Sequence, residues 1–344
     1  MAYSFRLKEF GNGTLQLTYY HNAIRTKEDY WKPYNYPDIP DDGIDTDGFD
    51  LGFRRLKSLS PFDLEKDATE LTLEDEYLIL SDEELQQKKD HSVRTSLNRS
   101  KRMIYDYGRS NVWEWFFTLT FKPVEQFDKD NYAECSKKVR KWFNNVRDNY
   151  CPKIKYLIVP EQHESGAWHF HALVSNCEGL TFEKAVNNRE FRKDKDGNIM
   201  FDKKGKPVPN KYFGEYLRTS YPDGEYIYNI AQYKNGFSTA TKIIDTHKAV
   251  SYVVKYMTKE LCECTFGMRR YYPSMNLELP DIKYICGMQD KIDLLISEIA
   301  YSHGGNLSID YMKSYDVDVN NYKNTVTIFE MSVSQNNAAA NVIS

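Results

Sequence analysis

The chain has 344 residues, enough for one large domain or for a core domain with extensions. Its formal net charge of -4 argues weakly against a nucleic-acid partner, although net charge averages over faces that can be opposite in sign. The six cysteines include no C-x-x-C pair, which favours reduced thiols in a cytoplasm over a secreted disulfide scaffold or a zinc ribbon. No stretch approaches the roughly 18 uncharged apolar residues of a membrane span, so we expect a cytoplasmic protein with no membrane partner.

Charge is unevenly distributed along the chain. Acidic residues crowd residues 38–50 and 70–84, whereas basic residues gather in a first block at 94–109 and a second block at 137–155. The first block contains Arg94, Arg99, Lys101, Arg102 and Arg109, and the second contains Lys137, Lys138, Arg140, Lys141, Arg147, Lys153 and Lys155. These blocks are either solvated faces or tracks for phosphate groups.

The N-terminal region combines a hairpin, a loop and a helix. Residues 10–20 predict a β-hairpin whose turn is formed by Asn12 and Gly13. Residues 33–60 are rich in Pro, Asp and Gly, which indicates a loop or linker. A helix is predicted at residues 92–107, and it carries the first basic block.

Residues 113–175 show the most regular pattern. Large residues alternate from Trp113 to Phe121, which predicts a half-buried strand. Apolar residues then recur at three- and four-residue spacing over residues 132–150, which predicts an amphipathic helix with the second basic block on its outer side. Short strands are predicted at residues 155–159 and 168–175.

The region that follows is predicted to contain a helix at 181–190, a charged hairpin at 191–208, a strand at 237–244 and a final helix at 247–261. The order strand, helix, strand, strand, helix, strand is typical of a ferredoxin-like antiparallel sheet. We therefore expect an α+β fold with a central antiparallel sheet.

A candidate metal site lies in the strand at 168–175, which contains His169-Phe170-His171. Because side chains alternate along a strand, both imidazoles point to one face while the neighbouring apolar residues pack on the other. Glu161 ends the preceding strand, where a hairpin would return its carboxylate beside the histidines, and His163 and Glu164 are weaker candidates. Two neutral nitrogens and one carboxylate leave open positions on a metal ion, although an H-x-H pattern alone also arises by chance.

A second candidate element is the predicted final helix. At about 100 degrees per residue, one stripe of this helix combines tyrosines and lysines and the opposite stripe is apolar. The first stripe contains Tyr252, Lys255, Tyr256 and Lys259, and the apolar stripe contains Val250, Val253, Val254, Met257 and Leu261. A tyrosine oxygen is a poor nucleophile at its free pKa of about 10, so a nearby cation and a metal-polarised phosphate would have to activate it. The alternative is a solvated amphipathic face.

These motifs resemble the HUH-superfamily replication initiators of rolling-circle replicons, particularly those of small single-stranded DNA phages. Three parts match in that family's order: the strand at 116–121, His169-Phe170-His171, and the tyrosine helix at 252–259. Relaxases, by contrast, place the tyrosine before the histidines. The acidic N-terminal region and the negative net charge depart from the family's pattern.

The resemblance implies a ferredoxin-like HUH endonuclease domain at residues 92–277. An N-terminal extension at 1–91, with the acidic stretches, would precede it. A C-terminal segment at 278–344 with a polar tail would follow. The implied partners are single-stranded or hairpin origin DNA and a host replication helicase or polymerase, in the host cytoplasm if a phage encodes the protein.

The resemblance also implies roles for individual residues. His169, His171 and Glu161 would hold Mg²⁺ or Mn²⁺ against the scissile phosphate. One tyrosine would attack phosphorus and leave a 5′-phosphotyrosine and a 3′-OH that primes synthesis. We expect Tyr252 to make this first link, because it lies nearer the helix start, where the positive end of the helix dipole favours a phenolate. The second tyrosine would serve a later transfer that rejoins the strand. Lys255 and Lys259 would stabilise charge on the phosphate.

Residues 92–109 are predicted from their charge to bind DNA, chiefly through its phosphates, because they carry Arg and Lys without an obvious base-reading motif. The residues concerned are Arg94, Arg99, Lys101 and Arg102.

Two other functions fit the same residues. A hydrolase would use the metal only to activate water, and it would still cut DNA without the tyrosines. A regulator without catalysis would bind an origin through the basic helices and would need no metal.

Overall fold

The computed structural model describes residues 2–25, 82–122, 127–163, 165–194, 198–220, 224–265, 267–286, 291–305, 307–319 and 322–333. The described residues 2–24 and 93–333 belong to one compact unit, whereas Arg25 and residues 82–92 are the described part of a second. The predicted loop at 33–60 and both acidic stretches, apart from the backbone of residues 82–84, lie outside the described residues.

Seven strands of the described residues form one antiparallel sheet, here called the first sheet, in the order β6-β7-β8-β3-β5-β4-β9. Its strands are β3 (Trp115–Leu119), β4 (Lys155–Gln162), β5 (Trp168–Ser175), β6 (Phe182–Lys184), β7 (Tyr228–Ile230), β8 (Ser238–Lys242) and β9 (Tyr272–Pro273). The chain passes from β3 through α3 (Tyr132–Asn149) to the hairpin β4-β5. The α+β fold with a central antiparallel sheet is therefore confirmed, and it is compatible with the ferredoxin-like class.

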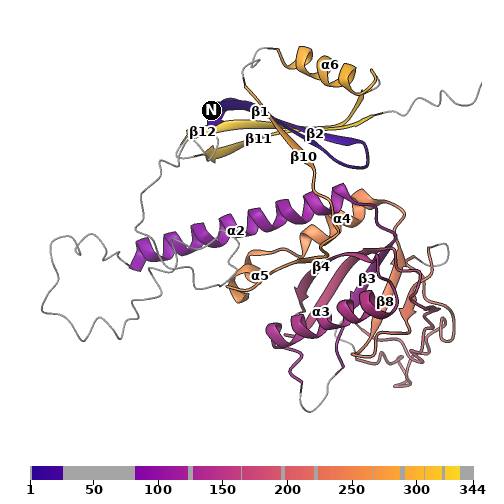
Figure 1. Ribbon diagram of the computed structural model, residues 1–344. Coiled ribbons are helices and arrows are strands. Elements are labelled where there is room, and N and C mark those ends of the chain that lie inside the picture. The colour runs from indigo at the N-terminus through magenta and orange to yellow at the C-terminus, as the bar shows by residue number, and fades with distance from the viewer. Residues whose placement is uncertain are drawn as a thin grey trace, which may run out of the picture. The chain divides into compact units, whose positions relative to one another are not determined.

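The first sheet is covered on both faces by helices (Figure 1). On one face the fully buried Phe117, Leu119 and Phe170 pack under α3, and the rings of Phe143 and Tyr156 approach to 4.4 Å between centroids. α3 begins at its N-cap Asn131, whose side chain accepts a hydrogen bond from the backbone of residue 134. The apolar spacing at 132–150 predicted this helix because it is a local signal of a 3.6-residue period.

The opposite face is covered by α4 (Thr246–Lys255), on which α2 (Asp82–Ser110) packs. A Cβ atom at Gly108 of α2 would lie 2.6 Å from Cγ1 of Val250 in α4, so the two helices approach more closely than any other residue at 108 would allow. α2 begins earlier than the predicted helix at 92–107.

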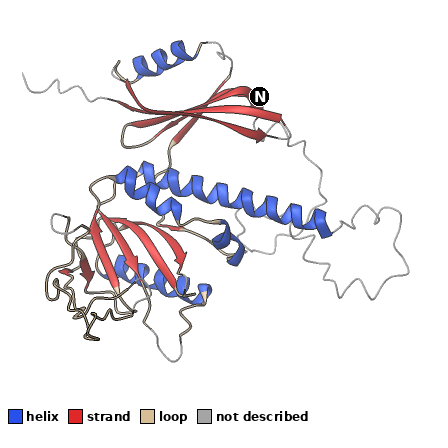
Figure 2. Cartoon of the chain, turned by 180° about the vertical axis from the view of Figure 1, so that it is seen from behind, coloured by secondary structure: helices blue, strands red, loops and turns tan. Residues whose placement is uncertain are grey.

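Five strands of the described residues form a separate second sheet in the order β10-β1-β2-β12-β11. Its strands are β1 (Ala2–Glu9), β2 (Thr14–Arg25), β10 (Asp281–Ile285), β11 (Leu307–Val319) and β12 (Tyr322–Val333). The predicted hairpin at 10–20 is confirmed as β1-β2, and Gly13 adopts the positive φ of 78° that its turn requires. α6 (Ile292–Ser302) covers one face, where Leu295 and Ile299 are buried (Figure 2).

Three details of the sequence-based prediction are wrong. Residues 182–184 form strand β6 rather than part of a helix at 181–190, because they pair with β7. The predicted helix at 247–261 is interrupted: α4 ends at Lys255, and α5 (Lys259–Cys264) starts anew behind the N-cap Thr258. It is also not the final helix, since α6 follows it.

No helix in the described part of the chain is long and apolar enough to cross a membrane.

Candidate active site

One face of the first sheet gathers the polar residues of β3, β4 and β5. In the ladder, His171 lies opposite Thr118 on one neighbouring strand and Val159 on the other, and His169 lies opposite Glu161. Residues directly opposite in an antiparallel pair share a face. Both histidines and Glu161 therefore lie on the α4 side of the sheet, as the alternation along β5 predicted.

The His171 imidazole is buried and is held at both ring nitrogens. Its Nε2 lies 2.7 Å from Oε2 of Glu161, and its Nδ1 lies 3.1 Å from the hydroxyl oxygen of Thr118. Because an ionised carboxylate only accepts hydrogen bonds, the Nε2–H group of His171 donates to Glu161. The hydrogen bond with His171 is the largest cause that lowers the pKa of Glu161 below its usual value, so this carboxylate is ionised at neutral pH.

His169 is half-buried and lies beside a third histidine. Its ring stacks on that of His163, with 5.3 Å between centroids. Burial is the largest cause that lowers the pKa of His169, and repulsion by His163 lowers it further. The ring is therefore neutral near pH 7, which is the form that binds metal ions.

Two tyrosines of the α4 region face these residues. The ring of Tyr256 stacks on the His171 ring, with 4.0 Å between centroids and 6° between planes. The ring of Tyr252 lies 5.1 Å from that of Tyr256 and 5.6 Å from Phe116 of β3. Tyr252 is 49% exposed, whereas burial, followed by the interaction with Tyr252 and the charge of Glu161, raises the pKa of Tyr256 far above its usual value. The structure thus brings together a histidine, a carboxylate and two tyrosines from three elements.

A comparison with families of known proteins gives a match to the part of the chain that contains these residues. Residues 114–261 match the model of a family described as replication-associated protein ORF2. The matched residues run from the start of β3 into α5, so they contain the histidines, Glu161 and both tyrosines but neither α2 nor the second sheet. No curated protein and no solved structure matches the chain. The match supports a replication-initiator-like role for this protein.

The imidazole and carboxylate groups of this site suit a divalent metal ion by their chemistry, although three of them are not close together. Among the described residues, no three His, Cys, Asp or Glu side chains are grouped as a metal ion would require. Glu161 is instead bonded to His171, and His169 lies against His163. Neutral imidazoles and an ionised carboxylate nevertheless form a donor set that such ions accept. The metal assignment stays a prediction.

The two lysines of the predicted stripe do not share one helix. Lys255 is exposed at the last residue of α4. Lys259 is the first residue of α5, and its Nζ lies 3.4 Å from a carboxylate oxygen of Glu263. The break between the helices separates them, and the roles predicted for them are untested.

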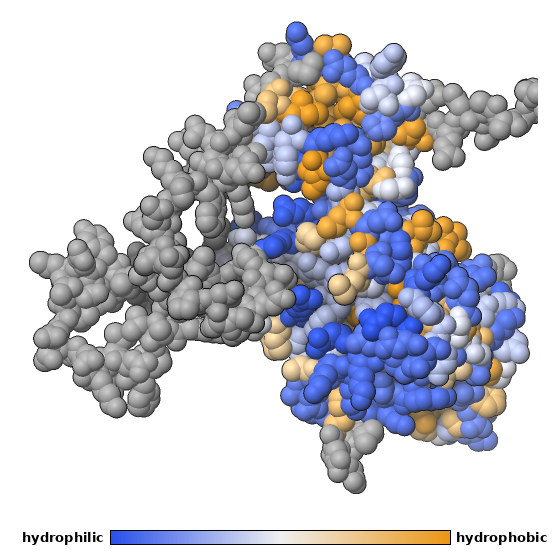
Figure 3. Space-filling view, in the orientation of Figure 1, coloured by the Kyte–Doolittle hydropathy of each residue, from blue (hydrophilic) through white to orange (hydrophobic). Residues whose placement is uncertain are grey.

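The basic blocks divide into exposed and buried members. Of the predicted DNA-binding residues, Lys101 is half-buried, and the exposed ones are Arg94, Arg99 and Arg102. Arg109 is not an unopposed cation as the sequence indicated: it is 3% exposed, and its Nη1 lies 3.1 Å from Oε2 of Glu330. The exposed cations of the second block other than Lys153 lie on α3, on the side of the first sheet away from the tyrosines, within a mainly hydrophilic surface (Figure 3).

Two residues near the site were not singled out from the sequence. Thr118 holds the Nδ1 atom of His171, and the ring of Phe116 lies 5.6 Å from both His171 and Tyr252. The strand alternation placed Thr118 on the face away from the core, but only the pairing of β3 with β5 shows which residue it meets.

Proposed function

We propose that this protein initiates replication by nicking single-stranded origin DNA, with Tyr252 as the attacking residue. The observation that supports this most directly is the stacking of Tyr256 on His171, because it brings the tyrosine pair to the face that holds His171 and Glu161. Of the two tyrosines, Tyr252 is the more accessible to a DNA strand.

The reaction transfers a phosphoryl group from DNA to the protein. The Oη atom of Tyr252 forms a bond to phosphorus while the bond from phosphorus to the 3′ oxygen breaks. The phenolic proton passes to solvent, and the 3′ oxygen takes a proton from solvent. The products are a 5′-phosphotyrosine and a free 3′-OH, which primes synthesis. Because the new phosphodiester retains the bond energy, a later attack by a 3′-OH rejoins the strand.

The residues around Tyr252 would support this transfer. His169, His171 and Glu161 would hold Mg²⁺ or Mn²⁺. When bound, such an ion polarises a phosphate oxygen as a Lewis acid. Lys255 and Lys259 would reduce the repulsion between the phosphate and the incoming oxygen, although Glu263 offsets part of the charge of Lys259.

The test is formation of a covalent adduct with DNA. The protein is incubated with a labelled single strand from its own replicon and Mn²⁺, then denatured. We expect a labelled protein band that His171→Ala abolishes and that Tyr150→Phe, an exposed tyrosine of the α3 side, leaves unchanged. Because His171 is buried, thermal unfolding verifies that the alanine variant is folded. Cleavage without an adduct would instead indicate a hydrolase, and binding without cleavage or metal requirement would indicate a regulator.

A further inference from the structure

A pocket beside the candidate active site has walls of mixed chemistry. It lies between the residues after β6 and the start of β8 and has a volume of about 600 Å³, within the range of about 300–1,000 Å³ that small ligands occupy. Its apolar lining includes Val186, Leu217 and Ile227. The other lining residues are Asn187, Asn188, Arg189, Phe191, Arg192, Lys193, Asn210, Phe237 and Thr239, so no carboxylate lies among the described residues that line it.

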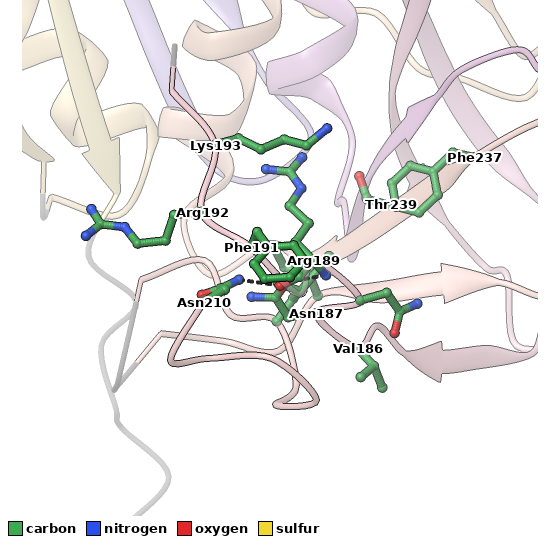
Figure 4. Close-up of a pocket in the computed structure, with 12 residues that line it drawn as sticks. Val186, Asn187, Arg189, Phe191, Arg192, Lys193, Asn210, Phe237 and Thr239 are labelled. Atoms are coloured by element: carbon green, nitrogen blue, oxygen red, sulfur yellow. Dashed lines mark hydrogen bonds between the residues drawn. The ribbon is translucent and has the colours of Figure 1, made fainter. Parts of the chain in front are cut away.

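Arg189 and Lys193 are exposed cations that line this pocket. No ion pair to Arg189 or Lys193 occurs within the part of the chain that the structure describes. The backbone of Arg189 is fixed on both sides, because its N–H donates to Oδ1 of Asn187 at 3.1 Å and its carbonyl accepts from Nδ2 of Asn210 at 2.8 Å. Figure 4 shows the ends of Arg189 and Lys193 on the side of Thr239, whereas Arg192 extends the other way. The fixed backbone keeps the base of the Arg189 side chain at the wall of the pocket before a ligand binds.

The pocket also offers an exposed aromatic ring. Phe237 is 56% exposed although it precedes a buried strand residue, and its backbone is anchored by hydrogen bonds from the amide and the hydroxyl group of Thr120. An exposed ring on a fixed backbone is a stacking surface for a nucleobase.

The pocket is connected to the candidate active site through the ladder of the first sheet. Thr239 lies opposite Thr118, and Thr118 lies opposite His171. Two strand spacings amount to about 10 Å, so a pocket ligand and a phosphate at His171 fit neighbouring nucleotides of one strand.

We propose that this pocket binds a nucleotide of the single-stranded DNA next to the scissile phosphate, with Phe237 against the base and with Arg189 and Lys193 on the backbone. An apolar ligand would gain nothing from Arg189 and Lys193, and a free phosphate would gain nothing from the ring and the apolar lining. Both features suit a nucleotide in a polymer that continues beyond the pocket. The inference rests on the proposed function in that single-stranded DNA is the substrate.

The test measures DNA binding without cleavage. Fluorescein-labelled oligothymidine is titrated in EDTA with the whole protein over a range of salt concentrations. For Arg189→Ala/Lys193→Ala we expect the slope of log affinity against log salt to fall by about 1.4, since each phosphate contact contributes about 0.7 on single strands. Phe237→Ala should weaken binding roughly 5- to 140-fold with an unchanged slope, and Phe237→Trp should retain the affinity.

The matched control is Lys203→Ala/Lys204→Ala, which removes the same charge from exposed residues of the same region outside the pocket. Thermal unfolding of each variant verifies that it is folded. If the pocket variants bind like this control, the nucleotide assignment is overturned even when the wild-type protein forms the covalent adduct. If the pocket variants bind weakly but no adduct ever forms, the pocket stands and the nicking proposal fails.

Discussion

The two tyrosines of the candidate active site differ in their surroundings although they are one helical turn apart. Tyr256 lies against His171 and near the charge of Glu161, and its raised pKa means that its phenolate is disfavoured. Tyr252 is half exposed, and its side chain is hydrogen-bonded to that of Tyr256. At the scale of single residues, burial therefore separates two side chains that the sequence ranked only by their positions along the helix.

We predict that Tyr252→Phe removes most of the initial DNA adduct. Tyr256→Phe should still nick, because its ring stacking on His171 is kept, but it should fail in the later strand transfer. The measurement is the yield of denaturation-resistant adduct, followed by peptide mass spectrometry to locate the modified tyrosine. An adduct found only on tyrosines outside the α4 region would refute this mechanism.

At the scale of elements, the position of the tyrosines depends on where α4 begins and ends. Asp245 caps its N-terminus by accepting a hydrogen bond from the backbone N–H of Lys248 at 3.0 Å. Thr258 caps α5 in the same way, through the N–H of Leu261 at 3.1 Å. Two helices with separate caps place Tyr256 in the C-cap position, from which its ring reaches β5.

We predict that Asp245→Ala lowers the free energy of unfolding by about 1 kcal/mol, the usual cost of losing an N-cap. The hydrogen bond from Lys248 lowers the folded-state pKa of Asp245 below the unfolded value of about 3.9. The charged Asp245 cap therefore makes its full contribution to the free energy of unfolding above about pH 4. This contribution is lost as the pH falls through the folded-state pKa of Asp245. Urea unfolding at neutral and acidic pH measures both effects.

The control is Asp245→Asn, because asparagine caps a helix but does not titrate. At neutral pH this variant should keep most of the free energy of unfolding of the wild type. On acidification its free energy of unfolding should fall less than that of the wild type, because the contribution of the Asp245 carboxylate is missing. Equal stability of the alanine variant and the wild type would show that the cap contributes nothing.

The close contact of α2 with α4 gives a prediction about packing. Gly108→Ala improves helix propensity by about 1 kcal/mol, but its Cβ would overlap Val250, and overpacking costs about 1–3 kcal/mol. We expect a net loss in the free energy of unfolding, because the β-branched valine is too stiff to move aside. In the background of Val250→Ala the same substitution should cost much less. A double-mutant cycle in urea checks this, and additive effects would contradict the contact.

At the scale of the whole molecule, segments from both ends of the described chain pair in the second sheet, where β12 lies between β2 and β11. Buried polar contacts join this sheet to α2. Lys8 of β1 forms an ion pair with Asp106, and both side chains are at least 95% buried. Arg109 donates to Glu330 of β12 and lies 2.6 Å from Nε2 of His247 at the start of α4. The second sheet and α2 lie outside the residues that match the family model. They are nevertheless linked by these contacts to α4, which carries Tyr252.

We predict that Asp106→Asn destabilises the protein by about 3–5 kcal/mol, because it leaves the ammonium group of Lys8 buried without a counter-ion. Burial is the largest cause that lowers the pKa of Lys8, and Asp106 opposes this effect. The double variant Lys8→Met/Asp106→Leu should recover most of the loss, since it removes both charges. Chemical denaturation gives the three free energies. If Lys8→Met/Asp106→Leu were no more stable than Asp106→Asn, the ion pair would stabilise the fold by more than the neutralisation of two buried charges.

Local patterns in the sequence were enough to predict the elements whose evidence lies within one segment. The alternation around Phe117 predicted β3, the 3.6-residue period predicted α3, and the placement of both histidines on one face of β5 followed from strand geometry alone. Glu161 was found because a short hairpin must return its strand beside the next. These inferences succeeded because neighbours in sequence are neighbours in space within a helix, a strand or a hairpin.

Contacts between distant residues became known only from the folded chain. The pairing of β2 with β12 joins residues more than 300 positions apart, and no local period records it. The same holds for Arg109, which has the sequence pattern of a surface cation but is buried against Glu330. Burial also ranks Tyr252 and Tyr256, and strand pairing sets Thr118 against His171. Pairing and burial depend on the packing of whole elements, and therefore on contacts that a pattern within one segment does not contain.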